Sequence, residues 1–263
     1  MRTLVFIPAW NEEDAVAEVI AGVRQRMPEV DVLVVDDGST DATAMRSREA
    51  GAVVATMPFN QGLGAALQTG YLYALREGYG FCAHLDADGQ HPPAEVARLL
   101  DEVRADRADL VIGSRYRHRG PAESDDYRPT LSRRIGTSVF RFFLTLATRQ
   151  RFTDTTSGMR AANRTVMKLF SERYSPDFAE IESLQLAVRE GLRVEEVPVR
   201  MLERAGGTSF LTPLRSAFFI FKGLIVLIVG QFRPRTAKSG QGRDHDHREP
   251  GEAGPLSSVE AER

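Results

Sequence analysis

Short apolar runs alternate with longer amphipathic stretches through the first half of the chain. The apolar runs predict five strands, at Thr3–Ile7, Asp31–Val35, Ala52–Thr56, Phe81–Leu85 and Leu110–Gly113. The stretches between them repeat with helical periodicity and predict helices near Glu12–Met27, Asp41–Ala50, Leu63–Glu77 and Pro93–Arg104. Such alternation is typical of an α/β protein whose mostly parallel central sheet is flanked by helices.

From about Tyr127 the pattern changes. A helix that mixes basic and apolar residues is expected at Arg128–Gln150, and a short strand at Gly158–Ala162. Further elements are expected at Arg164–Phe170 (helix), Phe178–Glu190 (helix), Arg193–Met201 (strand) and Thr212–Gln231 (apolar helix). Residues 233–263 are polar and poor in aromatics, a composition that predicts disorder. The chain therefore divides into a domain over 1–210, an apolar helix over 211–232 and a tail over 233–263.

Pairs of carboxylates follow two of the expected strands. Asp36 and Asp37 follow the second strand, and Asp86 and Asp88 follow the fourth. Ligands of open α/β sheets bind outside the carboxyl ends of the strands, so both pairs are expected at one edge. Residues i and i+2 of an extended segment point the same way, so Asp86 and Asp88 can hold one cation, with Gln90 as a neutral oxygen ligand. Such oxygens suit Mg²⁺ or Mn²⁺, although a lone acidic loop more often only caps the next helix.

Composition narrows the function little but excludes some classes. Of 263 residues, 42% are hydrophobic and 27% charged, which suits a soluble globular protein. A net charge of −2 provides no overall attraction to nucleic acid, so any basic site must be local. The single cysteine, Cys82, rules out an intramolecular disulfide framework, and the N-terminus runs straight into a strand with no sign of a signal peptide. The expected location is the cytoplasm.

Seven segments carry a family resemblance. They are PAWNEE, VVDDGSTDAT, NQGLGAALQTG, DADGQHPP, DLVIGSRY, TDTTSGMRAAN and EVPVRMLERAGGTS, in that order between residue 4 and about 210. Together they resemble the family 2 glycosyltransferases, and within these the dolichyl- and polyprenyl-phosphate mannosyl- or glucosyltransferases. The resemblance implies a GT-A fold over 1–210 with amphipathic helices toward the C-terminus. It also implies inverting, cation-dependent transfer of a hexose from a nucleotide diphosphate sugar to polyprenyl phosphate.

The resemblance assigns the donor site to residues that follow the first, second and fourth strands. The segments that hold Pro8, Trp10, Glu12, Val35 and Asp37 line the nucleoside pocket in the family, and Asp37 is expected to accept hydrogen bonds from base or ribose. Asp86, Ala87 and Asp88 are expected at the diphosphate, with Asp86, Asp88 and Gln90 as metal ligands. Trp10 stands where relatives often have tyrosine. GDP-mannose is the favoured donor and UDP-glucose the next. The choice between them stays open, because Phe210 stands where mannosyl synthases often carry lysine.

Basic residues are expected to hold the phosphates. The resemblance places Arg115 and Arg204 near the substrate phosphates, and Arg134 with Ser138 near the lipid phosphate; Asp88, Arg115 and Arg204 are the expected catalytic residues. Guanidinium groups pair bidentately with phosphate oxygens. A phosphate acceptor is ionised at pH 7 and needs no general base, which fits the absence of a clear hydroxyl-activating motif around Asp177, Glu180 and Glu182. Asp154 is expected to shape the acceptor loop.

The apolar segment Ala217–Gly230 is too short to span a bilayer. As a helix its 14 residues cover about 21 Å, whereas a spanning helix needs about 20 apolar residues, and Lys222 interrupts it. An interfacial helix is expected, with Arg134–Leu146 as a second contact, which makes the protein peripheral on the cytoplasmic face of the membrane. Docking on the core or in a homo-oligomer is the alternative.

Other functions remain open alongside the lipid-phosphate transferase. A glycan or small-molecule hydroxyl could be the acceptor, or the chain could be a non-catalytic nucleotide-sugar-binding subunit. An aspartyl phosphatase motif normally follows the first strand and continues with Thr or Val. Here the motif follows the fourth strand and continues with Gln90. A sugar nucleotidyltransferase would need a glycine-rich basic signature near the N-terminus, and that signature is absent from this sequence.

Overall fold

The computed structural model describes residues 1–117, 131–175, 178–202 and 222–230, with only the backbone of 131–136. In this part of the chain one seven-stranded sheet has the order β3-β2-β1-β4-β6-β5-β7. Its strands are β1 (Thr3–Ala9), β2 (Asp31–Asp36), β3 (Val53–Thr56), β4 (Phe81–His84), β5 (Leu110–Ser114), β6 (Arg160–Asn163) and β7 (Val194–Pro198). Only β6 runs antiparallel to its neighbours β4 and β5.

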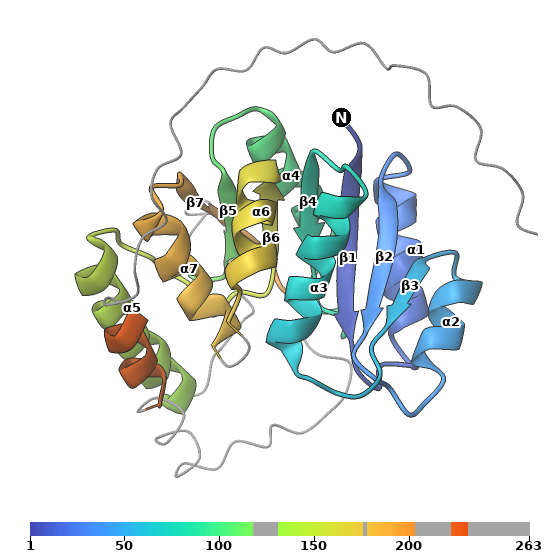
Figure 1. Cartoon of the computed structure of the whole chain (residues 1–263), viewed down its shortest axis with the longest axis horizontal. Coiled ribbons are helices and arrows are strands. Elements are labelled where there is room, and N and C mark those ends of the chain that lie inside the picture. Colours follow the sequence, from blue (N-terminus) through green and yellow to red (C-terminus); the bar gives the residue numbers. More distant parts are fainter. Residues whose placement is uncertain (118–130, 176–177, 203–221, 231–263) are drawn as a thin grey trace, which may run out of the picture.

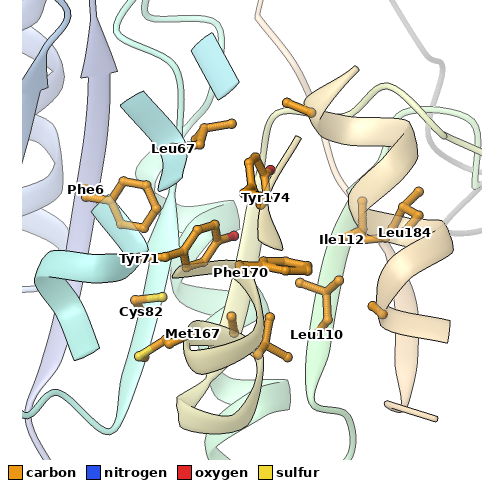
Figure 2. Packing of buried hydrophobic residues seen from close by; sticks show 14 of the residues in the cluster. Phe6, Leu67, Tyr71, Cys82, Leu110, Ile112, Met167, Phe170, Tyr174 and Leu184 are labelled. Carbon is orange, nitrogen blue, oxygen red and sulfur yellow. The ribbon is translucent and has the colours of Figure 1, made fainter. Parts of the chain in front are cut away.

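Helices cover both faces of this sheet (Figure 1). They are α1 (Val16–Arg26), α2 (Thr43–Glu49), α3 (Leu63–Arg76), α4 (Pro93–Arg104), α5 (Leu131–Thr148), α6 (Arg164–Arg173) and α7 (Ala179–Arg189). One core cluster lies under α3, α5, α6 and α7, and the other under α1 and α4. The first cluster contains an aromatic group in which Tyr71 contacts Phe6, Phe170 and Tyr174 with ring centroids 5.1–5.5 Å apart (Figure 2). Both faces are apolar because the strands alternate buried residues between the two clusters.

Most expected elements are present with ends shifted by one to three residues. The first helix is an exception, because it was expected from Glu12 and begins at Val16. Asn11 adopts a left-handed backbone with φ 53°, and the following residues turn toward the loop after β2. There the amide of Glu12 donates to Thr43 Oγ1 and that of Glu13 to Asp41 Oδ2. These bonds between loops keep the segment out of the helix.

A C-terminal helix over 222–230 lies beside α5 and α7 (Figure 1). A Cβ on Gly223 would come within 3.0 Å of the Phe140 and Phe178 rings, which shows how closely this helix packs. Gln185 donates to the carbonyl of Leu227, and Arg189 to that of Gly230. This stretch therefore docks on the core, while Ile225, Ile228 and Val229 stay about half exposed.

Some expectations fall on residues outside this description. They include the ends of the expected helix 212–231, the tail 233–263 and the exact boundaries at residues 210 and 211. Among the described residues, no helix has both the length and the apolar composition needed to cross a membrane.

Candidate active site

The loops after the parallel strands meet along one edge of the sheet. In β1 and β2, Pro8 pairs with Val35 and Ala9 with Asp36, so both strands end at the same level. β4 lies on the other side of β1, with Phe6 opposite His84. These strands end at the lower edge of the sheet in Figure 1. The expected convergence of the acidic strand ends is therefore present.

The carboxylates after β2 are buried and bonded to backbone amides. Asp36 is 1% and Asp37 3% exposed. Asp36 accepts from the amide of Ser39 at 3.1 Å, while the two oxygens of Asp37 accept from Gln61 and Gly62, each at 2.8 Å. Asp37 thus fixes the loop before α3 against the loop after β2.

The carboxylates after β4 are more accessible. The Asp86 side chain is 38% exposed, and Asp88 is half-buried. The amide of Asp86 donates to His91 Nδ1 at 3.0 Å, so His91 is a packed residue that shapes the loop. The amide of Gln90 donates to Asp88 Oδ1 at 3.0 Å, which folds the loop into a tight turn.

This loop offers oxygen ligands of the kind that Mg²⁺ and Mn²⁺ prefer. Within the described ranges, no three His, Cys, Asp or Glu side chains gather into a ready-made metal cage. Two carboxylates on a half-exposed loop fit a cation that takes its other ligands from water and a substrate diphosphate, as Mg²⁺ commonly does. The donor set at Asp86, Asp88 and Gln90 is therefore compatible with such an ion.

The residues expected at the nucleoside differ in how much of their side chains is exposed to solvent. Trp10 is 52% exposed at the end of β1, which excludes a core role for this ring. Glu12 is half-buried in the adjoining loop. Pro8, Val35 and Ala87 are buried, so they can offer a ligand little more than backbone atoms.

Arg115 forms a buried ion pair that the sequence did not reveal. Its Nε lies 2.6 Å from Asp154 Oδ2 and its Nη2 lies 2.7 Å from Oδ1, with side chains 4% and 0% exposed. Nη2 also donates to Thr156 Oγ1 at 2.9 Å. The pair ties the end of β5 to the loop before β6, and a role of this loop at the acceptor stays a prediction. Contact between Arg115 and a substrate phosphate stays a prediction.

Two further carboxylates lie near these loops, Glu196 at the loop before β6 and Glu180 near the loop after β4. Glu196 of β7, which sequence reasoning missed, accepts from the amides of Thr153 and Asp154 at 2.8–2.9 Å, and its burial raises its pKa. Glu180 in the first turn of α7 is partly buried. Burial raises its pKa; the charge of Arg160 opposes this rise and the charge of Asp86 adds to it. Glu180 therefore lies within the electrostatic reach of Asp86 in the acidic loop after β4.

The remaining expected phosphate ligands are described only in part. Arg134 lies on α5, but its side chain is outside the description, and Ser138 is exposed on the same helix. Arg204 also lies outside the described residues. The chain just before it does reach the acidic loop, because the amide of Leu202 donates to the carbonyl of Gln90 at 2.9 Å.

Fold and site together define an α/β protein whose carboxyl edge can hold a cation and a phosphate ester, the arrangement of GT-A glycosyltransferases. Residues 4–170 match the model of the family described as glycosyl transferase family 2, and the chain belongs to this family. It is a glycosyltransferase.

Relatives with similar sequences cover most of the chain. Polyprenol monophosphomannose synthase of Mycolicibacterium smegmatis is 35% identical over 229 residues, which are 83% of this chain and 84% of the relative. Undecaprenyl-phosphate mannosyltransferase of Micrococcus luteus is 35% identical over 221 residues, 80% of this chain and 87% of the relative. Glucosyl-3-phosphoglycerate synthase of Mycobacterium tuberculosis, solved with Mn²⁺, UDP and phosphoglyceric acid, has a TM-score of 0.65 at 22% identity, covering 88% of this chain and 78% of that one. This last likeness shows the fold.

Proposed function

We propose that the protein transfers a hexose from a nucleotide diphosphate sugar to polyprenyl phosphate, with inversion at the anomeric carbon and with Mg²⁺ or Mn²⁺ as cofactor. GDP-mannose is the favoured donor and UDP-glucose the next. The relatives named for mannosyl transfer to polyprenyl or undecaprenyl phosphate support the acceptor class and the sugar.

The half-exposed pair Asp86 and Asp88 carries the proposal. It lies at the carboxyl end of β4, where a diphosphate can approach, and both side chains are partly exposed there. Negative charge grows on the leaving diphosphate as the glycosidic bond breaks. A cation held by Asp86 and Asp88, with Gln90 nearby, would neutralise that charge and stabilise the transition state.

The acceptor in this proposal is a phosphate, which attacks without first losing a proton. Arg134 and Ser138 on α5, together with Arg204, are the proposed acceptor ligands. Arg115 supports the reaction through its ion pair with Asp154, which orders the loop before β6. Arg115 itself is proposed to lie near the substrate phosphates.

Peripheral contact with the membrane is part of the same proposal. Phe142 and Leu146 of α5 are 65% and 69% exposed, one turn apart on one side of the helix. Ile228 and Val229 of the adjacent helix 222–230 are 53% and 52% exposed. Two neighbouring helices with outward apolar side chains suit the interface of a bilayer, on its cytoplasmic face, where the lipid headgroup is presented.

The test is transfer of radiolabel to a lipid. Purified protein, Mn²⁺ and a short polyprenyl phosphate are incubated with labelled GDP-mannose or UDP-glucose in separate reactions, and organic-phase label is counted. We expect label from one donor, reduced at least about 100-fold by Asp88→Ala. No extractable label from either donor, with nucleotide binding confirmed, would contradict the acceptor and favour a hydroxyl acceptor.

A further inference from the structure

Arg160 is a fully buried arginine beneath the candidate active site. It opens β6, is 1% exposed, and pairs across the sheet with His84, two residues before Asp86. Arginine stays protonated even when buried, so its charge must be offset or used.

The guanidinium donates hydrogen bonds to three neutral acceptors. Nε donates to the carbonyl of Ser157 at 3.1 Å, Nη1 to Ser183 Oγ at 2.6 Å, and Nη2 to the carbonyl of Glu180 at 2.8 Å. Among the described residues, no carboxylate lies within ion-pair distance of it. A buried charge held only by neutral groups contributes little to stability compared with an apolar residue of similar volume. Its value must therefore lie in what the three acceptors hold in place.

The three acceptors belong to two segments, and the segment that contains Ser157 adjoins the proposed cation-binding loop. Ser157 precedes Gly158, and a Cβ on Gly158 would lie only 2.8 Å from Asp86 Oδ2. The backbone there passes directly against the Asp86 carboxylate. Glu180 and Ser183 lie in the first turns of α7, and Ser183 Oγ also donates to the carbonyl of Glu180 at 3.0 Å.

We propose that Arg160 is a positioning residue for glycosyl transfer: its guanidinium holds the Ser157–Gly158 backbone against the Asp86 carboxylate and anchors that backbone to the start of α7. This inference rests on the proposed cation site at Asp86 and Asp88. In this arrangement the Asp86 carboxylate keeps one orientation before a cation arrives, because the backbone beside it is anchored to α7 through Arg160.

The geometry explains why the residue is arginine. Three donors on a planar group reach three acceptors on two different segments at once. A lysine ammonium is a single donor atom and keeps the charge, yet it cannot span all three. Arg160→Lys therefore keeps the positive charge but loses the simultaneous hydrogen bonds to the three acceptors.

Ser183→Ala is the decisive variant, because it removes one of the three acceptors and leaves Arg160 in place. Ser47→Ala is the matched control, since Ser47 is also a buried helical serine and its Oγ donates to the Thr43 carbonyl at 2.7 Å, in α2. Mn²⁺ binding in the presence of GDP is measured by electron paramagnetic resonance, together with kcat, KM and the melting temperature. Arg160→Lys and Asp88→Ala complete the set.

For Ser183→Ala we expect Mn²⁺ binding about tenfold weaker and a lower kcat, the size typical of changes to groups that orient metal ligands. Ser47→Ala should lower the melting temperature equally and leave Mn²⁺ binding unchanged. Arg160→Lys, if folded, should resemble Ser183→Ala or exceed it. If Ser183→Ala matches Ser47→Ala in every measurement while Asp88→Ala abolishes Mn²⁺ binding, the role of Arg160 is wrong and the proposed function stands. If Asp88→Ala binds Mn²⁺ as the wild type does, the cation site is wrong and this inference falls with it.

Discussion

The two acidic strand ends look alike in the sequence and differ in the fold. After β2, Asp36 and Asp37 are buried; Asp36 accepts from the amide of Ser39 in its own loop, and Asp37 accepts from the amides of Gln61 and Gly62 in the loop before α3. After β4, Asp86 is 38% exposed and Asp88 half-buried at the same edge of the sheet. The first pair is built into the scaffold, whereas the second pair remains partly exposed at the edge of the sheet.

The difference comes from what packs against each pair. The loop before α3 folds over Asp37 and supplies two amide donors. After β4, the Asp86 carboxylate lies beside the Gly158 backbone, where glycine leaves room for it, and 3.7 Å from His91 Nδ1. An acidic motif after an apolar strand therefore indicates carboxylates at the carboxyl edge of the sheet. The groups that pack against these carboxylates determine whether they stabilise the fold or remain available to bind a ligand. Four predictions follow from this contrast, from the largest effect to the smallest.

Asp86→Asn should remove activity without unfolding the protein. Loss of a charged cation ligand should lower the transfer rate at least about 100-fold. Because the side chain is partly exposed, the free energy of unfolding should change by no more than about 0.5 kcal/mol. Label transfer and urea denaturation measure the two quantities. A large loss of stability would show that this pair is scaffold too.

Asp37→Asn should show the opposite behaviour. An asparagine offers one acceptor oxygen where two amides now donate, and the buried amide left unpaired costs about 1–3 kcal/mol of stability. Urea denaturation checks the loss. A rise in donor KM for the folded enzyme would support the proposed nucleoside contact as well. Unchanged stability would contradict the scaffold role.

The strand that leads to the exposed pair should make stability depend on pH. Burial lowers the pKa of His84, so the folded protein keeps this imidazole neutral beside Tyr71, whose hydroxyl lies 3.2 Å from its Nδ1. The unfolded chain binds a proton there below about pH 6.5. Stability is therefore lost as the pH falls below this value, by up to about 1.4 kcal/mol per pH unit. Urea denaturation between pH 7.5 and 5.5 should show that the free energy of unfolding depends less steeply on pH in His84→Asn than in the wild type. Equal slopes in the two proteins would contradict the role of His84.

Glu180→Gln should have the smallest effect on turnover. Glu180 lies within the field of Asp86, yet a phosphate acceptor needs no base. We expect turnover with polyprenyl phosphate to stay within about tenfold of the wild type, whereas loss of a general base costs about 100-fold or more. A folded, nucleotide-binding variant without activity would contradict the phosphate acceptor.

Much of the fold follows from local patterns. The helix Pro93–Arg104 was expected with the observed bounds, and Leu63–Glu77 differs from α3 by one residue. Periodicity reports which face of an element is apolar, and that is a local property. It does not report which strands become neighbours, so the antiparallel place of β6 between β4 and β5 was not anticipated.

The positions of site residues were predictable where a sequence motif places a characteristic residue directly after a strand. Asp86 and Asp88 lie at the expected edge for this reason. The roles of Glu196 and Arg160 were not predictable, because Glu196 bonds to Asp154 and Arg160 bonds to Glu180, 42 and 20 residues away in the chain. An isolated glutamate or arginine in a sequence carries no mark of such a distant partner.

The place of β6 also determines the order in which the molecule can be assembled. β5 bonds to β6 and β7 and makes no ladder with β4, although β4 precedes it in the chain. While the chain emerges from the ribosome, β1 to β4 can pair as soon as residue 84 is available. The other half of the sheet cannot join them until Arg160–Asn163 has been synthesised and enters between β4 and β5. The nascent β5 therefore waits through about 45 residues of further synthesis, which is several seconds at a typical rate of about 5–20 residues per second.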